Sequence, residues 1–308
     1  MADHRLAEPG LARNGLADHG FAGFAKRAAA TLFFTFFPAD CYICGSPLIR
    51  VSRIPVCEGC LIALRPLQGS YCSVCGEALH IPSPVGAGES RCLLCQRTDP
   101  PFERAVAYGS YDGGLRDLIH VLKFQQVRPA ADSLGRMLAE AMANLEQAMP
   151  MGTITVVPVP LHKRKQAQRG FNQAEMIVRA ALKRLSRPQR LKKRFALCTG
   201  VLLRRRETGS QIGLTRHQRR ENLRGAFAVS DPTRIVNRDI LLVDDVYTTG
   251  TTASECARVL LRAGAARVWV ATVARTLKIY DAISFAGDPP EDQSEEGGEV
   301  RLGAAAQG

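Results

Sequence analysis

The chain has 308 residues, a formal net charge of +12 and 46% hydrophobic residues. This length suits one sizeable core with a smaller module, and the ordinary apolar content excludes a chain that is disordered throughout. No apolar run is long enough to span a bilayer as a helix, so we expect no transmembrane segment and a cytoplasmic location.

The positive charge is concentrated in one segment, which we call the basic belt. Between Leu161 and Arg224 the sequence holds 19 Lys and Arg against 3 Glu. Such a density of positive charge suits a polyphosphate or a nucleic acid. A solvated basic face without a partner is the alternative.

Residues 1–40 are expected to be a mobile N-terminal extension that contains one short helix. The first twenty residues are rich in Ala, Gly and polar side chains and have no strong period. From Phe21 to Phe37 the composition is apolar, but no small-x-small cleavage site of a signal peptide follows it. We predict a short helix whose aromatic side packs on the protein, with contact to a membrane surface as the alternative.

Residues 41–100 hold eight of the ten cysteines, arranged as four Cys-x-x-Cys pairs. Two such pairs can hold one tetrahedral Zn²⁺ ion, so four pairs predict two structural zinc sites in a double zinc ribbon. Gly45 and Gly76 directly follow two of the pairs, where a ligand-bearing turn favours a positive φ. A disulfide-linked secreted module is the alternative. Consecutive pairing would group Cys41, Cys44, Cys57 and Cys60 in one site and Cys72, Cys75, Cys92 and Cys95 in the other, and an interleaved pairing is also compatible with the spacing.

Pro100-Pro101 is the expected linker to a larger domain, residues 102–280. This domain begins with a strand pattern from Ala105 to Tyr111. Two helical patterns follow, one ending at Lys123-Phe124 and one starting after Pro129. A second buried strand is predicted from Thr153 to Val159.

The first part of the basic belt follows that second strand. A run with four basic residues, ending at Arg169, comes after a proline-bounded turn and is typical of a diphosphate cradle. Gly170-Phe171-Asn172-Gln173 then opens the next predicted helix. Residues 202–224 are basic, contain few apolar anchors and are predicted to form a hood over a site.

The most informative stretch runs from Ile240 to Thr252. Four apolar residues predict a strand that is buried on both faces, and this run ends at the two carboxylates of Asp244 and Asp245. A helix pattern follows as far as Gly264, then a last strand from Val268 to Val273. Residues 281–308 gain Pro, Gly, Glu and Ser and are expected to be a disordered tail.

The segment between the acids and the helix has the composition of an anion site. The N-terminus of a helix presents backbone N–H groups and the positive end of the helix dipole. The acids suit vicinal sugar hydroxyls or a bound Mg²⁺, and we expect both of them to face solvent. Together these features predict a ligand with a phosphate at one end and a ribose diol nearby, and the phosphate-binding residues would be Thr248, Thr249, Gly250, Thr251 and Thr252.

Alternating strands and helices predict an α/β fold with an open parallel sheet. In such sheets ligands bind beyond the carboxyl ends of the strands, where the turn after Val159 and the acidic pair would meet.

The acidic pair and the threonine loop resemble the phosphoribosyl-diphosphate (PRPP) signature of type I phosphoribosyltransferases, although Tyr247 stands where that signature has an aliphatic residue. The resemblance widens to the ComF family through further motifs in the same order. These are the Cys-x-x-Cys pairs, Tyr111–His120 with Lys123-Phe124, Val157–Pro160, Arg169–Glu175 and Gln218-x-x-x-Asn222.

This resemblance implies a type I phosphoribosyltransferase domain behind a double zinc ribbon, in a protein with a link to DNA uptake in natural competence. On this interpretation Asp244 and Asp245 hold the ribose of PRPP, with Mg²⁺ on the ligand, and Lys123 and Arg169 hold its diphosphate. The acceptor and the oligomeric state are not specified. The alternative is a non-catalytic accessory protein that binds single-stranded DNA through its ribbons and the basic belt, with the competence machinery as a partner.

Overall fold

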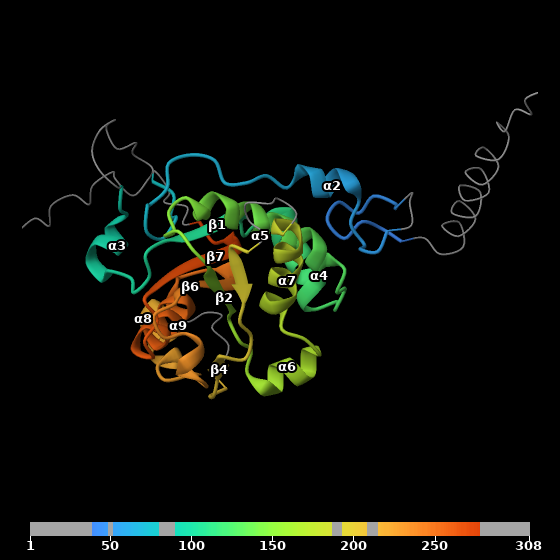
Figure 1. Cartoon of the computed structure of the whole chain (residues 1–308). Coiled ribbons are helices and arrows are strands. Elements are labelled where there is room, and N and C mark those ends of the chain that lie inside the picture. Colours follow the sequence, from blue (N-terminus) through green and yellow to red (C-terminus); the bar gives the residue numbers. More distant parts are fainter. Residues whose placement is uncertain (1–38, 49–51, 80–89, 187–192, 208–214, 278–308) are drawn as a thin grey trace, which may run out of the picture. The chain divides into compact units, whose positions relative to one another are not determined.

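The computed structural model describes residues 39–48, 52–79, 90–186, 193–207 and 215–277, all within one compact unit, Met1–Leu277 (Figure 1). The expected N-terminal helix and the expected disordered tail lie outside the described residues. Among the residues it describes, no helix is both long and apolar enough to cross a membrane. The division of the chain at Pro100-Pro101 stays a prediction.

The centre of the fold is a five-stranded sheet in which all strands are parallel, as predicted from the alternation of strands and helices. The strand order is β1-β7-β6-β2-β3, so β6 lies in the middle and β1 and β3 at the edges. The strands are β1 (Ala105–Ser110), β2 (Ile154–Pro158), β3 (Phe195–Leu197), β6 (Asp239–Tyr247) and β7 (Arg267–Arg275).

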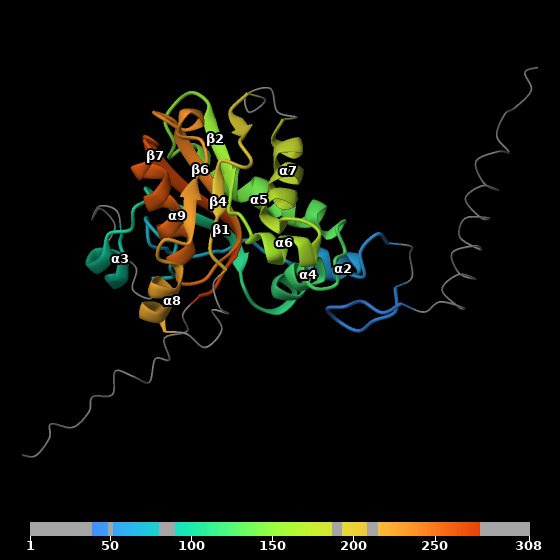
Figure 2. The same ribbon diagram turned by 90° about the horizontal axis from the view of Figure 1, so that it is seen from below.

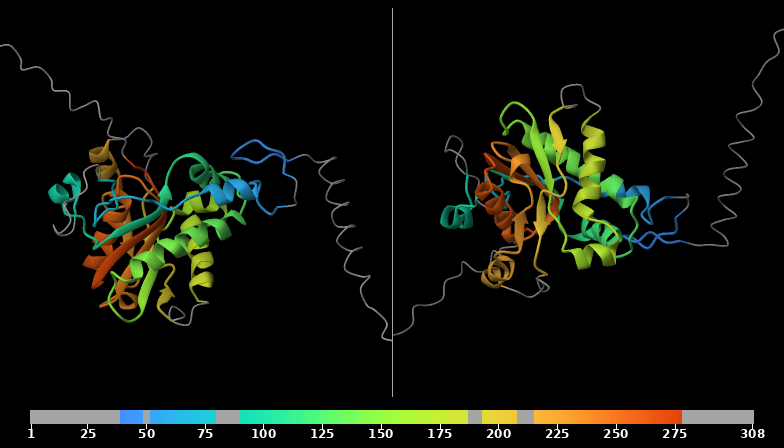
Figure 3. Two further views of the ribbon diagram at one scale, coloured as in Figure 1. Left: turned by 90° about the horizontal axis from the view of Figure 1, so that it is seen from above. Right: turned by 60° about the horizontal axis from the view of Figure 1, so that its bottom comes forward.

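Alternate residues of β6 enter two separate cores, one on each face of the sheet. Leu241 and Val243 belong to the core that contains the buried residues of α4, α5 and α7. Ile240 and Leu242 belong to the core that contains those of α9. Two views show these helices on opposite sides of the sheet, and Figure 3 gives the same arrangement from two further directions (Figures 1, 2 and 3). The helices are α4 (Gly113–Lys123), α5 (Ala130–Glu146), α7 (Gln173–Leu185) and α9 (Thr251–Arg262).

These helices lie where the sequence pattern predicted them, and local chemistry explains two of their features. The Asn172 side chain accepts hydrogen bonds from the backbone N–H groups of Ala174 and Glu175, which starts α7. Gly135 lets α5 approach α7 closely, because a Cβ at this position would lie 2.5 Å from that of Ala180. The helices α5 and α7 therefore pack closely against each other on one face of the sheet.

Several short elements of the basic belt were not predicted. The basic run that follows β2 forms a helix, α6 (Lys163–Arg169). The segment expected to be a hood contains a helix, α8 (Arg216–Leu223), which starts with a capping box between Thr215 and Gln218. The same segment begins with the strand β4 (Leu202–Arg204), which pairs antiparallel with β5 (Phe227–Val229). A 3₁₀ turn, η2 (Pro232–Arg234), follows β5.

The cysteine-rich region contains the same turn twice. In each copy the N–H of the first cysteine donates to the residue five positions later, Cys41 to Ser46 and Cys72 to Glu77. Gly45 and Gly76 both have a φ of +70°, as their positions predicted. The second half of each copy begins a short helix, α2 (Glu58–Ala63) after Cys57 and α3 (Leu93–Thr98) after Cys92.

Candidate functional site

The acidic pair lies on a part of β6 that has a neighbour on one side only. The register between β2 and β6 ends at Pro158 and Val243, and the N–H of Val159 then donates to the carbonyl of Val243. On the other side β6 stays paired with β7 as far as Tyr247. The sequence had suggested that the strand ends at the two acids. In the structure it continues past them to Tyr247. The departure of β2 leaves one edge of the acidic segment open among the described strands.

Asp245 is the more deeply buried of the two acids, with 4% exposure. Its Oδ2 lies 2.6 Å from Nζ of Lys123 at the end of α4. The expectation that both acids face solvent is therefore wrong for Asp245, because a lysine 122 positions earlier covers it and neutralises it. Arg169 lies on the same side, where burial lowers its pKa and the charge of Asp245 opposes that shift.

Asp244 is intermediate in exposure and lies on the side of α9. Its Oδ1 accepts a hydrogen bond of 2.8 Å from the N–H of Asp245. The protein packed around it, followed by the charge of Asp245, raises the pKa of Asp244 to about 8. It also borders a cavity of about 20 Å³, enough for about one water molecule. The two acids thus differ in their surroundings.

The loop after β6 brings hydroxyl groups to the start of α9. Gly250 precedes the helix with a φ of +73°, a conformation that glycine adopts without strain. The hydroxyls of Thr249 and Thr251 are hydrogen-bonded at 2.8 Å. Thr248 and Thr252 border the same small cavity as Asp244. All five residues predicted to bind phosphate therefore lie at one helix N-terminus, beside Asp244.

Tyr247 and Arg275 support this loop from below, and no pattern in the sequence indicated their contact. The guanidinium of Arg275 lies 5.2 Å from the centre of the Tyr247 ring, and Phe102 meets that ring edge-on at 6.4 Å. A Cβ on Gly250 would lie 2.1 Å from the Tyr247 hydroxyl. Tyr247 therefore packs directly beneath the turn that starts α9.

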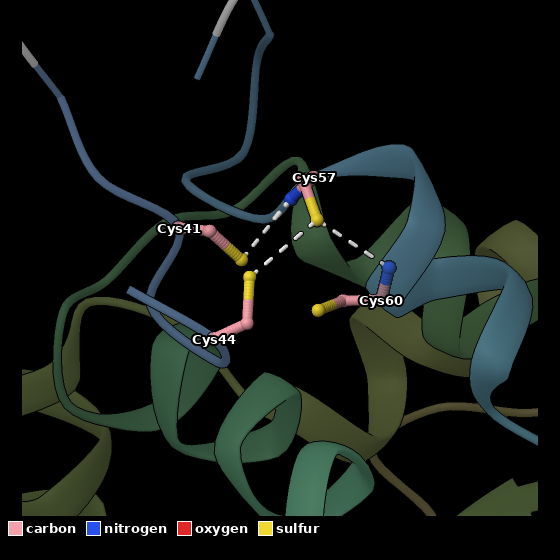
Figure 4. A group of neighbouring side chains, drawn as sticks. All are labelled: Cys41, Cys44, Cys57 and Cys60. Atoms are coloured by element: carbon pink, nitrogen blue, oxygen red, sulfur yellow. Dashed lines mark hydrogen bonds between the residues drawn. The ribbon is translucent and has the colours of Figure 1, made fainter. Parts of the chain in front are cut away.

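The eight paired cysteines form two four-cysteine clusters, and their grouping is the consecutive one. Cys41, Cys44, Cys57 and Cys60 form the first, and Cys72, Cys75, Cys92 and Cys95 form the second. All ten cysteines of the chain are free of disulfides. Within each cluster all four sulfur atoms lie within 4.8 Å of one another, and in the first they point toward a common centre (Figure 4).

The distances within the clusters match the geometry of zinc. A tetrahedral ion with Zn–S bonds of about 2.3 Å separates its sulfur ligands by about 3.8 Å. The Sγ atoms of Cys44 and Cys57 are 3.8 Å apart, and those of Cys75 and Cys92 are 3.7 Å apart. Backbone N–H groups also point at sulfur, for example from Cys57 to Cys41 at 3.3 Å. Both clusters could therefore bind zinc.

The basic belt divides into side chains that face solvent and side chains held by the fold. Lys163 and Arg164 of α6 are exposed. Arg206 donates to two backbone carbonyls near the end of α8, and the guanidinium of Arg204 lies 5.4 Å from the Phe227 ring centre. Burial lowers the pKa of Arg204. Part of the belt thus serves the fold.

Comparison with known proteins gives relatives that match most of the chain. A "DNA utilization protein YhgH" from Salmonella typhi is 33% identical over 242 residues, which are 78% of this chain and 98% of the relative. The "Competence protein F" of Haemophilus influenzae is 28% identical over the same shares. The "Competence protein ComFC" of Bacillus subtilis is 24% identical, over 68% of this chain and 80% of the relative. No family model matches the chain.

Among solved structures, a hypoxanthine phosphoribosyltransferase from Staphylococcus aureus is 13% identical, with a TM-score of 0.31, over 47% of this chain and 64% of that one. A glutamine PRPP amidotransferase from B. subtilis is 22% identical, with a TM-score of 0.27, over 47% and 26%. Scores of this size carry no weight for the site, whose description rests on the residues above.

Proposed function

The chain belongs to the ComF family, and we propose that it binds PRPP at the carboxyl edge of its sheet and acts as a phosphoribosyltransferase. The observation that carries this proposal is the meeting of three groups around the end of β6. These are the acidic pair, the threonine loop at the N-terminus of α9, and the two cations Lys123 and Arg169. PRPP has a matching set of groups, namely a ribose diol, a 5′-phosphate and a diphosphate.

Each group of the ligand has a counterpart with suitable chemistry. The helix N-terminus and the hydroxyls of Thr249 and Thr251 suit the 5′-phosphate. The carboxylates of Asp244 and Asp245 suit the ribose hydroxyls, which donate hydrogen bonds. Lys123 and Arg169 suit the diphosphate, whose negative charge grows as it leaves. When bound with the ligand, Mg²⁺ would neutralise part of that charge.

The reaction needs positioning more than covalent help. An acceptor attacks C1 of the ribose while the C1–oxygen bond to diphosphate breaks, and diphosphate leaves with the electron pair. The acids hold the ribose for this attack, and the cations stabilise the leaving group. Lys123 has a second task, because it is also the counterion of Asp245.

Asp244→Asn and Asp245→Asn test the proposal by calorimetric titration with PRPP and Mg²⁺. We expect each variant to bind at least about tenfold more weakly at a pH above 8, where Asp244 is ionised and its replacement removes a charged hydrogen-bond acceptor for the diol. Asp239→Asn is the matched control, because Asp239 is an acid at the other end of β6 and pairs with Arg267. Wild-type affinity in the double variant Asp244→Asn/Asp245→Asn would rule out the site.

Stability must be measured in parallel, because Asp245 is buried against Lys123. Removal of its charge leaves a half-buried ammonium with a weaker partner, and we expect a loss of about 1–3 kcal/mol in the free energy of unfolding. Titrations are therefore carried out well below the melting temperature of each variant. Diphosphate release with a panel of nucleobases then tests turnover.

A role in DNA binding is the second candidate, favoured by the exposed cations of α6 and by the relative described as a DNA utilization protein. Lys163→Ala with Arg164→Ala would weaken single-stranded DNA binding and lower its salt slope by up to about 1.4 units, about 0.7 for each phosphate that is no longer neutralised. Arg206→Ala is a poorer probe, since Arg206 also supports α8. DNA affinity without PRPP binding would favour this candidate over the enzyme.

A further inference from the structure

One exposed aromatic ring beside the site has no role in the proposed chemistry. Phe124 directly follows Lys123 at the end of α4, and 67% of its surface is exposed. A single exposed apolar side chain needs no explanation by itself, but Phe124 lies beside the site and specific contacts hold its ring. Among the described residues, Tyr42 is the other aromatic in the set of exposed large apolar side chains, and it lies between two ligands of the first four-cysteine cluster.

The ring of Phe124 is held in place by its neighbours. His120, one turn earlier in α4, meets it edge-on with ring centres 5.1 Å apart. His120 is in turn hydrogen-bonded through Nε2 to the hydroxyl of Tyr111 at 3.1 Å. Burial, followed by the charge of Arg116, lowers the pKa of His120, which keeps the imidazole neutral at neutral pH. The ring is therefore braced by an uncharged partner.

Arg169 holds a cation over the same ring. Its guanidinium lies 5.8 Å from the ring centre, and its Nη1 donates to Oε1 of Gln173 at 2.7 Å. The neighbouring Lys123 is bound to Asp245. An aromatic surface thus lies next to the cations and acids expected to hold a sugar phosphate. An apolar peptide or an acyl chain would not interact favourably with these charges. A nucleobase has a flat π-surface that stacks on an aromatic ring and polar edges that contact charged groups.

We propose that Phe124 is a stacking platform that holds a nucleobase at the mouth of the PRPP site. The inference deepens the proposed function, on which it rests for the identity of the neighbouring ligand, by naming the class of molecule brought to the site. The base can be free or part of a single strand, since both present the same ring.

The experiment uses the full-length zinc-loaded protein and the fluorescence of 2-aminopurine, which is quenched on stacking. Two probes separate the sources of the base: free 2-aminopurine, and a short oligodeoxythymidylate with 2-aminopurine at its centre. A strand of abasic sites of equal length reports phosphate contacts alone. PRPP binding is measured on the same samples by calorimetry.

Phe124→Ala should weaken binding of the base-containing probe by about 5- to 100-fold, the effect of removing one base–aromatic stack. Phe124→Tyr should retain binding, because it keeps the ring. PRPP and the abasic strand should bind Phe124→Ala within about twofold of wild type. Leu93→Ala is the matched control, because it removes a side chain that is 70% exposed in α3.

Three outcomes would overturn the platform. One is wild-type protein that quenches neither probe, and another is Phe124→Ala with unchanged base affinity. The third is a parallel loss of PRPP affinity in Phe124→Ala, which would make Phe124 a support for Lys123 and Arg169. Phe124-dependent quenching in a protein that does not bind PRPP would instead refute the proposed function and leave the platform intact.

Discussion

The two four-cysteine clusters are built from the same turn but are attached to the protein in different ways. In the first, Cys44 is exposed and Cys57 and Cys60 are partly buried. Its contact with α4 is made by Ile43, whose Cγ2 would lie 3.3 Å from a Cβ on Gly114. In the second, Cys72, Cys75 and Cys95 are at most 5% exposed.

The second cluster is also joined to the sheet by a buried ion pair. Arg275, at the end of β7 and 2% exposed, donates to the carbonyl of Cys75 and lies 2.7 Å from Oε2 of Glu77. The same guanidinium lies over Tyr247, which supports the turn at Gly250. The two clusters therefore differ in how they are held. The first packs against the core that contains α4, α5 and α7 and keeps an exposed ligand, whereas the second lies in the core with Tyr247 and is also joined to β7 by a buried ion pair.

Loss of a ligand from the second cluster should have the largest effect. We expect Cys75→Ser to lose about one zinc ion and to lower the free energy of unfolding by more than about 4 kcal/mol, because both the metal and the buried contacts of its turn depend on it. Denaturant unfolding with zinc analysis measures both. A Cys75→Ser protein as stable as wild type would contradict the difference between the clusters.

Arg275→Met tests the ion pair without touching a cysteine. Glu77 would remain buried without its guanidinium, so we expect a loss of about 3–5 kcal/mol and weaker PRPP binding through the Tyr247 loop. Arg267→Met is the control on the same strand, since its pair with Asp239 is more exposed and contributes much less to stability. Equal losses in the two variants would mean that burial of the pair is unimportant.

Cys44→Ser should have a smaller effect than either change above. It removes an exposed ligand, and we expect a smaller loss of stability than in Cys75→Ser and a loss of about one zinc ion, with PRPP affinity unchanged. The comparison with Cys75→Ser in one unfolding series is the decisive measurement. Loss of PRPP binding in Cys44→Ser would show that the first cluster also supports the site, through α4.

The smallest expected effect is a pH dependence of PRPP affinity that comes from Asp244 and not from Asp245. Asp244 has a pKa of about 8, so it is mostly protonated at neutral pH and loses its proton as the pH rises. PRPP affinity should then increase by up to about tenfold between about pH 7 and pH 9, as the binding-competent carboxylate becomes populated. Asp244→Asn should abolish this increase, and an unchanged pH profile would exclude Asp244 as its source.

The same raised pKa makes the opposite prediction for stability. Between the ordinary pKa of a carboxyl group and about 8, the folded protein binds a proton at Asp244 that the unfolded chain does not. This contribution to stability is complete at acidic pH and is lost as the pH rises toward 8. Thermal unfolding of wild type and Asp244→Asn over this range measures it.

The sequence predicted features whose cause is local. The apolar run before Asp244, the glycine at 250 and the spacing of the cysteines each determine a strand, a turn or a cluster within a few residues. The strand at Phe195–Leu197 was missed because three residues carry no measurable period, and α6 was missed because none of its residues is buried.

Contacts between distant residues had no signal in the sequence. The burial of Asp245 depends on Lys123, and the burial of the second cluster depends on Arg275. The cysteine spacings of the two clusters are similar, and nothing in them indicates which cluster is buried. Phe124 was predicted only as the end of a helix, since its exposure follows from where α4 ends relative to β6.

The pairing of Glu77 with Arg275 also sets an order of events during synthesis of the chain. The two residues are 198 positions apart, so at ribosomal rates of about 5–20 residues per second the first waits about 10–40 s for the second. The strand β1 waits as well, because its described partner is β7. The first cluster meets Gly114 much sooner. During synthesis, the second four-cysteine cluster would therefore reach its final buried state last. Its cysteines would stay accessible to metal until β7 emerges from the ribosome.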